Sequence, residues 1–175
     1  MINMPYLFGT PLFRLMLLFY ATFFVLQWGY QEAKGTTIEQ FVIDTATVKP
    51  SVFFINQIRP DEQVIAQGHR LVSPYIRLSV LNGCEGIESV FLIIAAIAAF
   101  RSSWRHKIVG LFLGVVLIYL ANQARIVALY FSLRYDRVWF ELLHGYIGPT
   151  LIIALGFVFY LWWTKWSARQ NYVIQ

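Results

Sequence analysis

Four long apolar runs dominate this chain, and they are too long and too closely spaced to form the core of a water-soluble domain. A membrane-spanning helix needs about 20 apolar residues, because each residue adds about 1.5 Å and the hydrocarbon core is roughly 30 Å thick. Only 13% of the 175 residues are charged, about half the share of a typical soluble domain. We therefore predict an all-α integral membrane protein with about four transmembrane helices in a bundle. The predicted spans are residues 12–30, 83–100, 108–131 and 146–163.

The first run is predicted to be an uncleaved span rather than a signal peptide. Its apolar region is long, the basic start before it is thin, and no small-x-small cleavage site follows it. The second run is strongly apolar over a short length only, so we expect its polar start at or just inside the membrane interface. Pro149 falls in the first turn of the fourth run, where a missing backbone N–H costs little.

Between the first two runs lies the longest polar stretch, residues 31–82. Ile76, Leu78 and Val80 alternate with polar residues, which is typical of a strand with one buried face. The Gln67-Gly68 pair stands between two short apolar segments and indicates a hairpin turn. We expect a small extracytoplasmic cap of a few strands or short helices, held loosely against the bundle.

The distribution of charge predicts how the chain is oriented in the membrane. The segment through Arg14, the loop 101–107 and the segment after Trp163 together carry six Lys or Arg residues and no Asp or Glu. Basic, acid-free segments are typically cytoplasmic. We therefore expect a multi-pass protein of the cell (inner) membrane with both termini in the cytoplasm and residues 31–82 outside.

The net charge of +5 does not indicate nucleic acid as a partner, because the basic residues flank apolar runs and form no continuous polar face. The only cysteine, Cys84, cannot form an internal disulfide, and no Cys/His cluster indicates a metal site. We expect membrane lipids as contacts and neither a metal nor a cofactor.

Three reactive side chains stand at comparable places in the apolar runs. Cys84 opens the second run, Arg125 lies near the end of the third, and His144 precedes the fourth. Arg125 follows Ile108 by about 17 residues, or roughly 26 Å of helix, so alternating spans bring all three side chains to the outer face. A thiol, a guanidinium and an imidazole are the parts of a cysteine-dependent acyl-transfer site. We expect them to converge there.

The residues beside Cys84 predict a polar helix start. Asn82 and Glu85 have the spacing of a helix cap and its return partner. At a helix start, unpaired backbone N–H groups and the helix dipole favour a thiolate over a thiol. Gly83 and Gly86 remove side chains beside the sulfur, which would let a substrate backbone approach closely.

Nearby charges act on this thiol in both directions. The carboxylates of Glu85 and Glu88 disfavour a thiolate, and Arg125 could offset them. Asn122 lies three residues before Arg125 on the same helical face, which favours an inward-facing polar pair. Each reactive group also has an ordinary interpretation: a small packing residue for the cysteine, contact with lipid headgroups for the arginine, and an interfacial side chain for His144.

Three segments of this sequence resemble the exosortase/archaeosortase family: Asn-Gly-Cys84-Glu-Gly-Ile-Glu-Ser, Ala-Asn122-Gln-Ala-Arg125-Ile, and His144 before the last run. The resemblance covers roughly residues 63–163, and the chain looks like a compact member. It implies a membrane-embedded cysteine peptidase/transpeptidase in which Cys84 is the nucleophile, Arg125 stabilises the oxyanion and His144 transfers protons.

The resemblance also implies a substrate. Family members are thought to act on secreted proteins that end in a short motif, a membrane span and a basic tail, and in bacteria they are associated with exopolysaccharide systems. We therefore expect cleavage of such a protein on the extracytoplasmic side, with either hydrolysis or transfer to an amine as the outcome. The alternative is a non-catalytic bundle that binds a partner transmembrane segment or assists polysaccharide export. A transporter is a third option, although four short spans offer little pathway.

Overall fold

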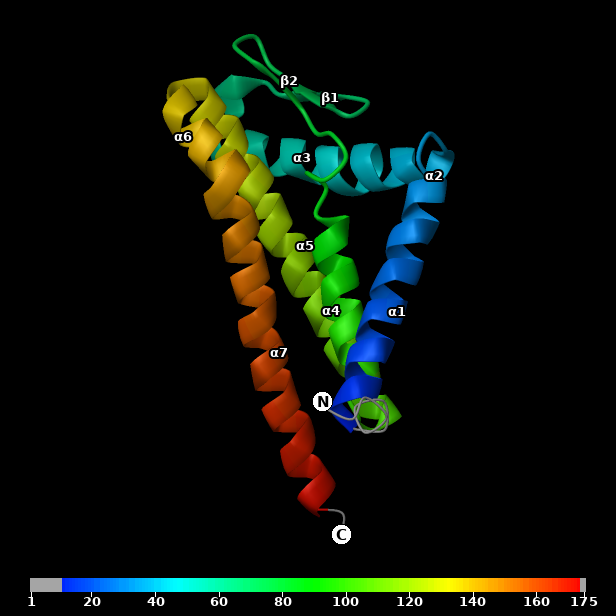
Figure 1. Ribbon diagram of the computed structural model, residues 1–175. Helices are drawn as coiled ribbons and strands as arrows, with labels where there is room; N and C mark the ends of the chain where they lie inside the picture. The colour runs from blue at the N-terminus through cyan, green and yellow to red at the C-terminus, as the bar shows by residue number, and fades with distance from the viewer. Residues whose placement is uncertain (1–10, 174–175) are drawn as a thin grey trace, which may run out of the picture.

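The computed structural model describes residues 11–173 of the chain. Its backbone is mostly helical, and four apolar helices run in the same general direction (Figure 1). They are α1 (Pro11–Glu32), α4 (Ile87–Ala99), α5 (Trp104–Tyr135) and α7 (Gly148–Val173). Helix α5 ends at the extended residue Asp136, and from there the short helix α6 (Arg137–Leu142) and the π-helix η4 (Leu143–Ile147) lead into α7 without a further break in helical backbone.

The predicted fold class is confirmed: the chain is an all-α membrane protein. Three helical stretches in the described part of the chain are long and apolar enough to cross a membrane: Leu12–Glu32, Trp104–Tyr135 and Arg137–Arg169. The second predicted span, 83–100, is shorter than expected, because α4 has only 13 residues, about 20 Å of helix. Residues 83–86 precede that helix as a non-helical loop.

The four helices pack around α4 and α5. Helix α4 lies between α1 and α5, and α7 packs on both α5 and α4. Near the cytoplasmic end predicted from the charges, Gly110 lies against the indole of Trp163, whose Nε1 donates a hydrogen bond to the backbone oxygen of His106 at 3.0 Å. Toward the other end, α1 and α7 diverge from each other (Figure 1). The buried core of this part consists of Ile93, Ile97, Ile118, Ile152 and Trp163.

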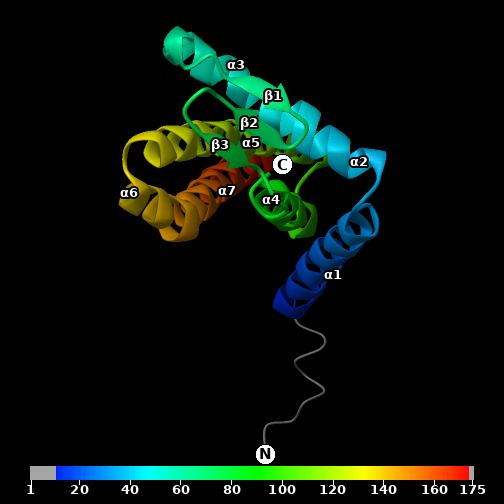
Figure 2. The same ribbon diagram turned by 90° about the horizontal axis from the view of Figure 1, so that it is seen from above.

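Residues 37–81, which we call the cap, cover one end of the bundle (Figure 2). A continuous helical stretch opens it: α2 (Thr37–Gln40), the π-helix η2 (Phe41–Val48) and α3 (Lys49–Ile58). A 3-10 turn, η3 (Pro60–Glu62), leads to a three-stranded antiparallel sheet in the order β1-β2-β3. The strands are β1 (Ile65–Gln67), β2 (Arg70–Val72) and β3 (Arg77–Ser79).

The predicted hairpin is confirmed. Gln67 pairs with Arg70, so Gly68 and His69 form the turn between β1 and β2. Gly68 has a φ of 57°, which glycine adopts without the steric cost that a side chain would bring. Leu78 lies in β3 and is buried, as the alternating pattern predicts.

The expectation that the cap is held loosely is wrong, because the cap and the upper part of α5 share one hydrophobic core. Its buried members come from the helical stretch, from the sheet and from α5: Ile43, Val48, Ile55, Val64, Leu71, Leu78, Val80, Ile126, Leu129 and Tyr130. A buried hydrogen bond adds to this contact, since Ser51 Oγ donates to Gln123 Oε1 at 2.7 Å. Polar Gln123 in the third apolar run therefore anchors the cap.

A buried carboxylate ties the cap to the end of α5. Glu62 is only 5% exposed. Tyr130 donates a hydrogen bond to its Oε2 at 2.7 Å, and Arg134 Nε lies 3.7 Å from its Oε1. The guanidinium of Arg134 also lies 3.9 Å from the centre of the Tyr75 ring. This network gives Arg134, at the end of α5, an acidic and an aromatic partner from the cap.

We expect Tyr130→Phe to destabilise the cap, because it removes the 2.7 Å hydrogen bond to the buried carboxylate of Glu62. The cost should be about 1–3 kcal/mol. The matched control is Tyr135→Phe, since Tyr135 is exposed and its hydroxyl lies 3.4 Å from the same carboxylate. Thermal unfolding in detergent, together with limited proteolysis of residues 59–81, measures the difference. Equal effects of the two substitutions would contradict this account of the network.

Candidate functional site

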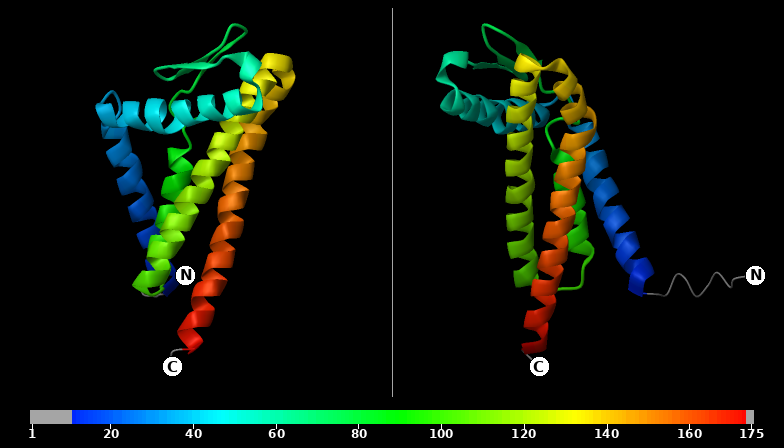
Figure 3. Two further views of the ribbon diagram at one scale, coloured as in Figure 1. Left: turned by 180° about the vertical axis from the view of Figure 1, so that it is seen from behind. Right: turned by 90° about the vertical axis from the view of Figure 1, so that its left-hand side faces the viewer.

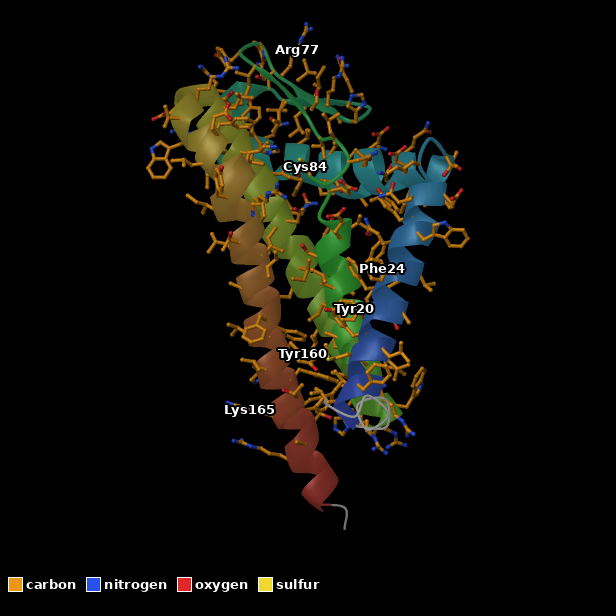
Figure 4. The ribbon with its side chains drawn as sticks, viewed as in Figure 1. Tyr20, Phe24, Arg77, Cys84, Tyr160 and Lys165 are labelled. Atoms are coloured by element: carbon orange, nitrogen blue, oxygen red, sulfur yellow. The ribbon has the colours of Figure 1, made fainter. Side chains whose placement is uncertain are left out.

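The structure brings Cys84, Arg125 and His144 together from three separate elements. Cys84 lies in the loop between β3 and α4 (Figure 4), Arg125 on α5, and His144 in η4. The sulfur of Cys84 lies 4.0 Å from Nδ1 of His144, and the guanidinium of Arg125 is close enough to act on the thiol by charge and by a hydrogen bond. The three side chains thus meet where the bundle joins the cap.

The loop that carries Cys84 differs from the predicted helix start. The residue before the first turn of α4 is Gly86, which has a φ of 79° and no side-chain cap. Asn82, predicted as the cap with Glu85 as its return partner, instead hydrogen-bonds to the carboxylate of Glu39. Cys84 therefore lies before the helix and not in its first turn, and its own N–H donates to the oxygen of Leu81 at 2.9 Å.

Asn122 of α5 holds this loop in place. Its side chain is 2% exposed, and its Nδ2 donates to the backbone oxygens of Glu85 at 2.8 Å and of Cys84 at 3.4 Å. Gly86 packs directly on it, since a Cβ at that position would lie 2.6 Å from Cγ of Asn122. Gly86 therefore makes room for an amide of the protein itself, whereas the sequence suggested room for a substrate. Gly83 (φ 92°) has open space around it.

Arg125 is fixed from two sides. Its Nη1 donates to Oδ1 of Asn122 at 3.5 Å, one turn earlier on α5. On the other side Gly148 begins α7, and a Cβ there would lie 2.8 Å from Nε of Arg125. That Nε is buried and has no hydrogen-bond partner among the described residues. The guanidinium also lines a cavity of about 310 Å³ between α5 and the start of α7.

His144 stands at the exposed edge of the site. Its ring stacks on that of Phe140, one turn earlier, with centroids 5.6 Å apart and planes within 3°. Because η4 is a π-helix, its backbone departs from the regular α-helical ladder at this residue, a feature that is frequent at functional sites. The exposed imidazole can exchange protons with water as well as with the sulfur beside it.

The thiol of Cys84 is protonated more readily than the sequence predicted. Burial raises the pKa of Cys84 above its ordinary value, and this effect outweighs the guanidinium of Arg125, which lowers it. Glu85 raises the pKa further. The expectation of a thiolate favoured by a helix start is therefore wrong, since the loop position removes the helix dipole and burial disfavours the charged form.

Glu85 and Glu88 are both directed toward α1. Glu85 is 7% exposed and accepts a hydrogen bond from the hydroxyl of Tyr30 at 3.1 Å. Glu88 accepts one from Nε2 of Gln27 at 3.2 Å. The sequence analysis missed this role of α1. The sequence did contain a signal for it: Gln27 and Tyr30 are polar, stand three residues apart near the end of the first apolar run, and therefore share one helical face.

An apolar cavity of about 360 Å³ lies below the loop, between α1, α4 and α7. Small residues contribute to its wall, among them Ser89, Ala96 and Gly156. The larger lining residues are Leu15, Phe19, Leu92, Ile93, Ile118, Ile152, Ile153, Phe157 and Tyr160. Among residues 11–173, no group of three or more His, Cys, Asp or Glu side chains is arranged to hold a metal ion.

Comparison with known proteins identifies one family. A family model described as transmembrane exosortase matches residues 4–163, which include the loop of Cys84, Arg125 and His144. Comparison with curated proteins and with solved structures finds no match. The family match spans most of the chain and confirms the resemblance seen in the sequence motifs. The chain therefore belongs to the transmembrane exosortase family, whose members are membrane proteins with a role in transpeptidation and protein sorting.

Proposed function

We propose that this protein is a cysteine peptidase/transpeptidase that cleaves a secreted protein at its C-terminal sorting signal. The observation that carries the proposal is the contact between the sulfur of Cys84 and Nδ1 of His144, beside the guanidinium of Arg125. The reaction takes place on the extracytoplasmic side of the cell (inner) membrane, and both termini lie in the cytoplasm. Components of an exopolysaccharide system are further partners.

The first step forms a thioester. Because burial raises the pKa of Cys84 and so favours the thiol, His144 accepts the thiol proton as the sulfur attacks the scissile carbonyl carbon. The carbonyl oxygen gains negative charge, which the permanently charged guanidinium of Arg125 stabilises in a poorly hydrated site. The C–N bond then breaks, and the imidazolium gives its proton to the leaving amine. Attack by water on the thioester gives hydrolysis, and attack by an amine gives transpeptidation; either releases the Cys84 thiol.

Asn122 supports this chemistry as a positioning residue. Its Nδ2 donates to the backbone oxygens of Cys84 and Glu85, and its Oδ1 accepts a hydrogen bond from Arg125. The side-chain amide of Asn122 therefore contacts both the loop that carries the nucleophile and the guanidinium that stabilises the oxyanion. Fixed placement of these groups raises the reaction rate, because misplacement by about 1 Å can lower the rate roughly a hundredfold.

The apolar cavity below the loop supports a substrate that is itself anchored in the membrane. Its lining is mostly apolar, and small residues such as Ser89, Ala96 and Gly156 let a helix approach closely. A substrate span between α1 and α7 would place the first residues outside the membrane next to Cys84. The same cavity also suits the alternative function, a non-catalytic bundle that binds a partner transmembrane segment. The two functions differ in one requirement: only the enzyme needs the thiol of Cys84.

Replacing Cys84 by Ala or Ser should abolish processing of the substrate. The test co-expresses the chain with a secreted protein of the same source that ends in a short motif, an apolar span and a basic tail. We expect the wild type to shorten this protein and both variants to leave its intact mass unchanged, a loss of at least about a thousandfold in rate. Processing that survives in Cys84→Ala would rule out the thiol as nucleophile and leave the binding function.

Arg125→Gln should slow alkylation of Cys84 by iodoacetamide. The guanidinium lowers the pKa of the thiol, so its removal raises that pKa and reduces the thiolate fraction at pH 8. We expect the rate to fall by about three- to tenfold and the pH profile to move to higher pH. Intact mass measures the reaction cleanly, because Cys84 is the chain's only cysteine. Arg137→Gln removes an exposed arginine near the same end and is the matched control; an equal effect of both substitutions would contradict a local role of Arg125.

A further inference from the structure

We propose that the helical stretch of residues 37–58 lies parallel to the extracytoplasmic surface of the membrane that holds the chain, with one apolar side inserted among the lipids. We call this stretch, formed by α2, η2 and α3, the transverse helix. It runs across the ends of the apolar helices, on the side of α5 that faces away from α7 (Figures 2 and 3). The inference concerns the lipid surroundings of the cap and holds whether or not Cys84 is a nucleophile.

One side of the transverse helix faces the protein core. Ile43, Val48, Ser51 and Ile55 are all buried, and they pack against α5 and the sheet. This side attaches the helix firmly to the ends of the spans. Its distance from the membrane is therefore set by α5.

A second side is polar and is turned toward the sheet. Asn56 exchanges two hydrogen bonds with the backbone of Val64, at 2.8 and 2.9 Å. Gln40 and Asp44 line a polar cavity that they share with His69 of the hairpin turn. These polar groups of the helix thus lie on the side that faces the sheet.

A third side is apolar and is turned toward the spans. Val42 and Ala46 line an apolar cavity together with Val90 of α4 and Tyr119 of α5, and the hydroxyl of Tyr119 donates to the backbone oxygen of Ala46 at 2.9 Å. The apolar side therefore continues the surface that the spans present to lipid. A helix with its apolar side toward the hydrocarbon and its polar side toward water is the arrangement of an interfacial helix.

Large apolar side chains project from this helix without a protein partner that covers them. The exposed fractions are 59% for Ile38, 63% for Phe41, 58% for Phe53 and 38% for Phe54. Lys49 is also exposed, and a lysine on such a helix suits the phosphate groups of lipids. In a water-facing cap these phenyl rings would form an exposed apolar patch, which soluble surfaces rarely keep without a binding partner.

The π-helix η2 places the two most exposed rings on one side. Phe41 and Phe53 are twelve positions apart, so on a regular α-helix they would be separated by about 120° around the axis. The wider turns of a π-helix, with i→i+5 hydrogen bonds, rotate the chain less per residue. The eight residues of η2 remove most of that offset. This irregular segment thus builds an apolar side that the sequence spacing does not reveal.

Lipid fits this side better than a second copy of the chain does. The apolar side lines one cavity together with α4 and α5, so a lipid that contacts these two helices would also reach this side. Insertion also sets the depth of the candidate site, because Cys84 packs against the core cluster that contains Ile43 and Val48. The sulfur would then lie at the membrane surface, where the first residues after a substrate's span emerge.

The test uses single reporter cysteines in the Cys84→Ser chain, reconstituted in phosphatidylcholine/phosphatidylglycerol nanodiscs. A bimane label is attached to Phe53→Cys on the apolar side or to Gln40→Cys on the polar side, which is the matched control. Quenchers are a lipid with a doxyl group at acyl carbon 5 and aqueous iodide. We expect the lipid quencher to act at least about twofold more strongly on position 53 than on position 40, and iodide to show the opposite order.

Two results would overturn the proposal. Equal iodide quenching at positions 53 and 40 would show that the apolar side faces water, and protection of position 53 from both quenchers would show that protein covers it. Phe41→Cys provides a second position on the same side, so the result does not rest on one variant. Each labelled protein is compared with its Cys84→Ser parent by gel filtration and thermal unfolding, which shows that the fold is retained.

Discussion

A non-helical loop at the end of a membrane span needs hydrogen-bond partners for its backbone, and in this protein Asn122 supplies them. Irregular backbone is tolerated at membrane depth only where the protein itself satisfies the exposed groups. The amide of Asn122 donates to the oxygens of Glu85 and Cys84, and Gly86 lacks a side chain that would push the amide away. The shape of the loop, and with it the position of the sulfur, depends on this contact.

The same amide arranges the electrostatics of the site. Arg125 follows Asn122 by one helical turn and donates to it, while Gly148 leaves space for the guanidinium at the start of α7. Burial raises the pKa of the Cys84 thiol, so the proposed reaction needs a base to accept its proton, and Nδ1 of His144 lies 4.0 Å from the sulfur. An arginine is suited to the opposite role, because its charge does not depend on pH. Burial thus assigns different tasks to the cation and the imidazole.

The sequence predicts those features that depend on apolar run length and on alternation of the spans. These rules place Cys84, Arg125 and His144 at one end of the bundle, and turn chemistry predicts the hairpin at Gly68. They do not reveal the loop, because Asn82 and Glu85 imitate a helix cap while their real partners, Glu39 and Tyr30, lie far away in the chain. Nor do they reveal the transverse helix, whose three-sided surface passes through a π-helical segment and matches no single period.

The short length of α4 and the proposed position of the transverse helix both bear on how deep in the membrane Cys84 lies. Helix α4 is about 20 Å long and cannot cross the hydrocarbon core alone, and a loop of turns precedes it at the end that carries Cys84. Glu85 in this loop bonds to Tyr30 near the end of α1, which places the loop close to the membrane boundary. In the proposed function, a substrate that enters as an apolar span would leave the membrane at that same level. A site on a longer helix would stand in water, above the first peptide bonds that such a substrate exposes.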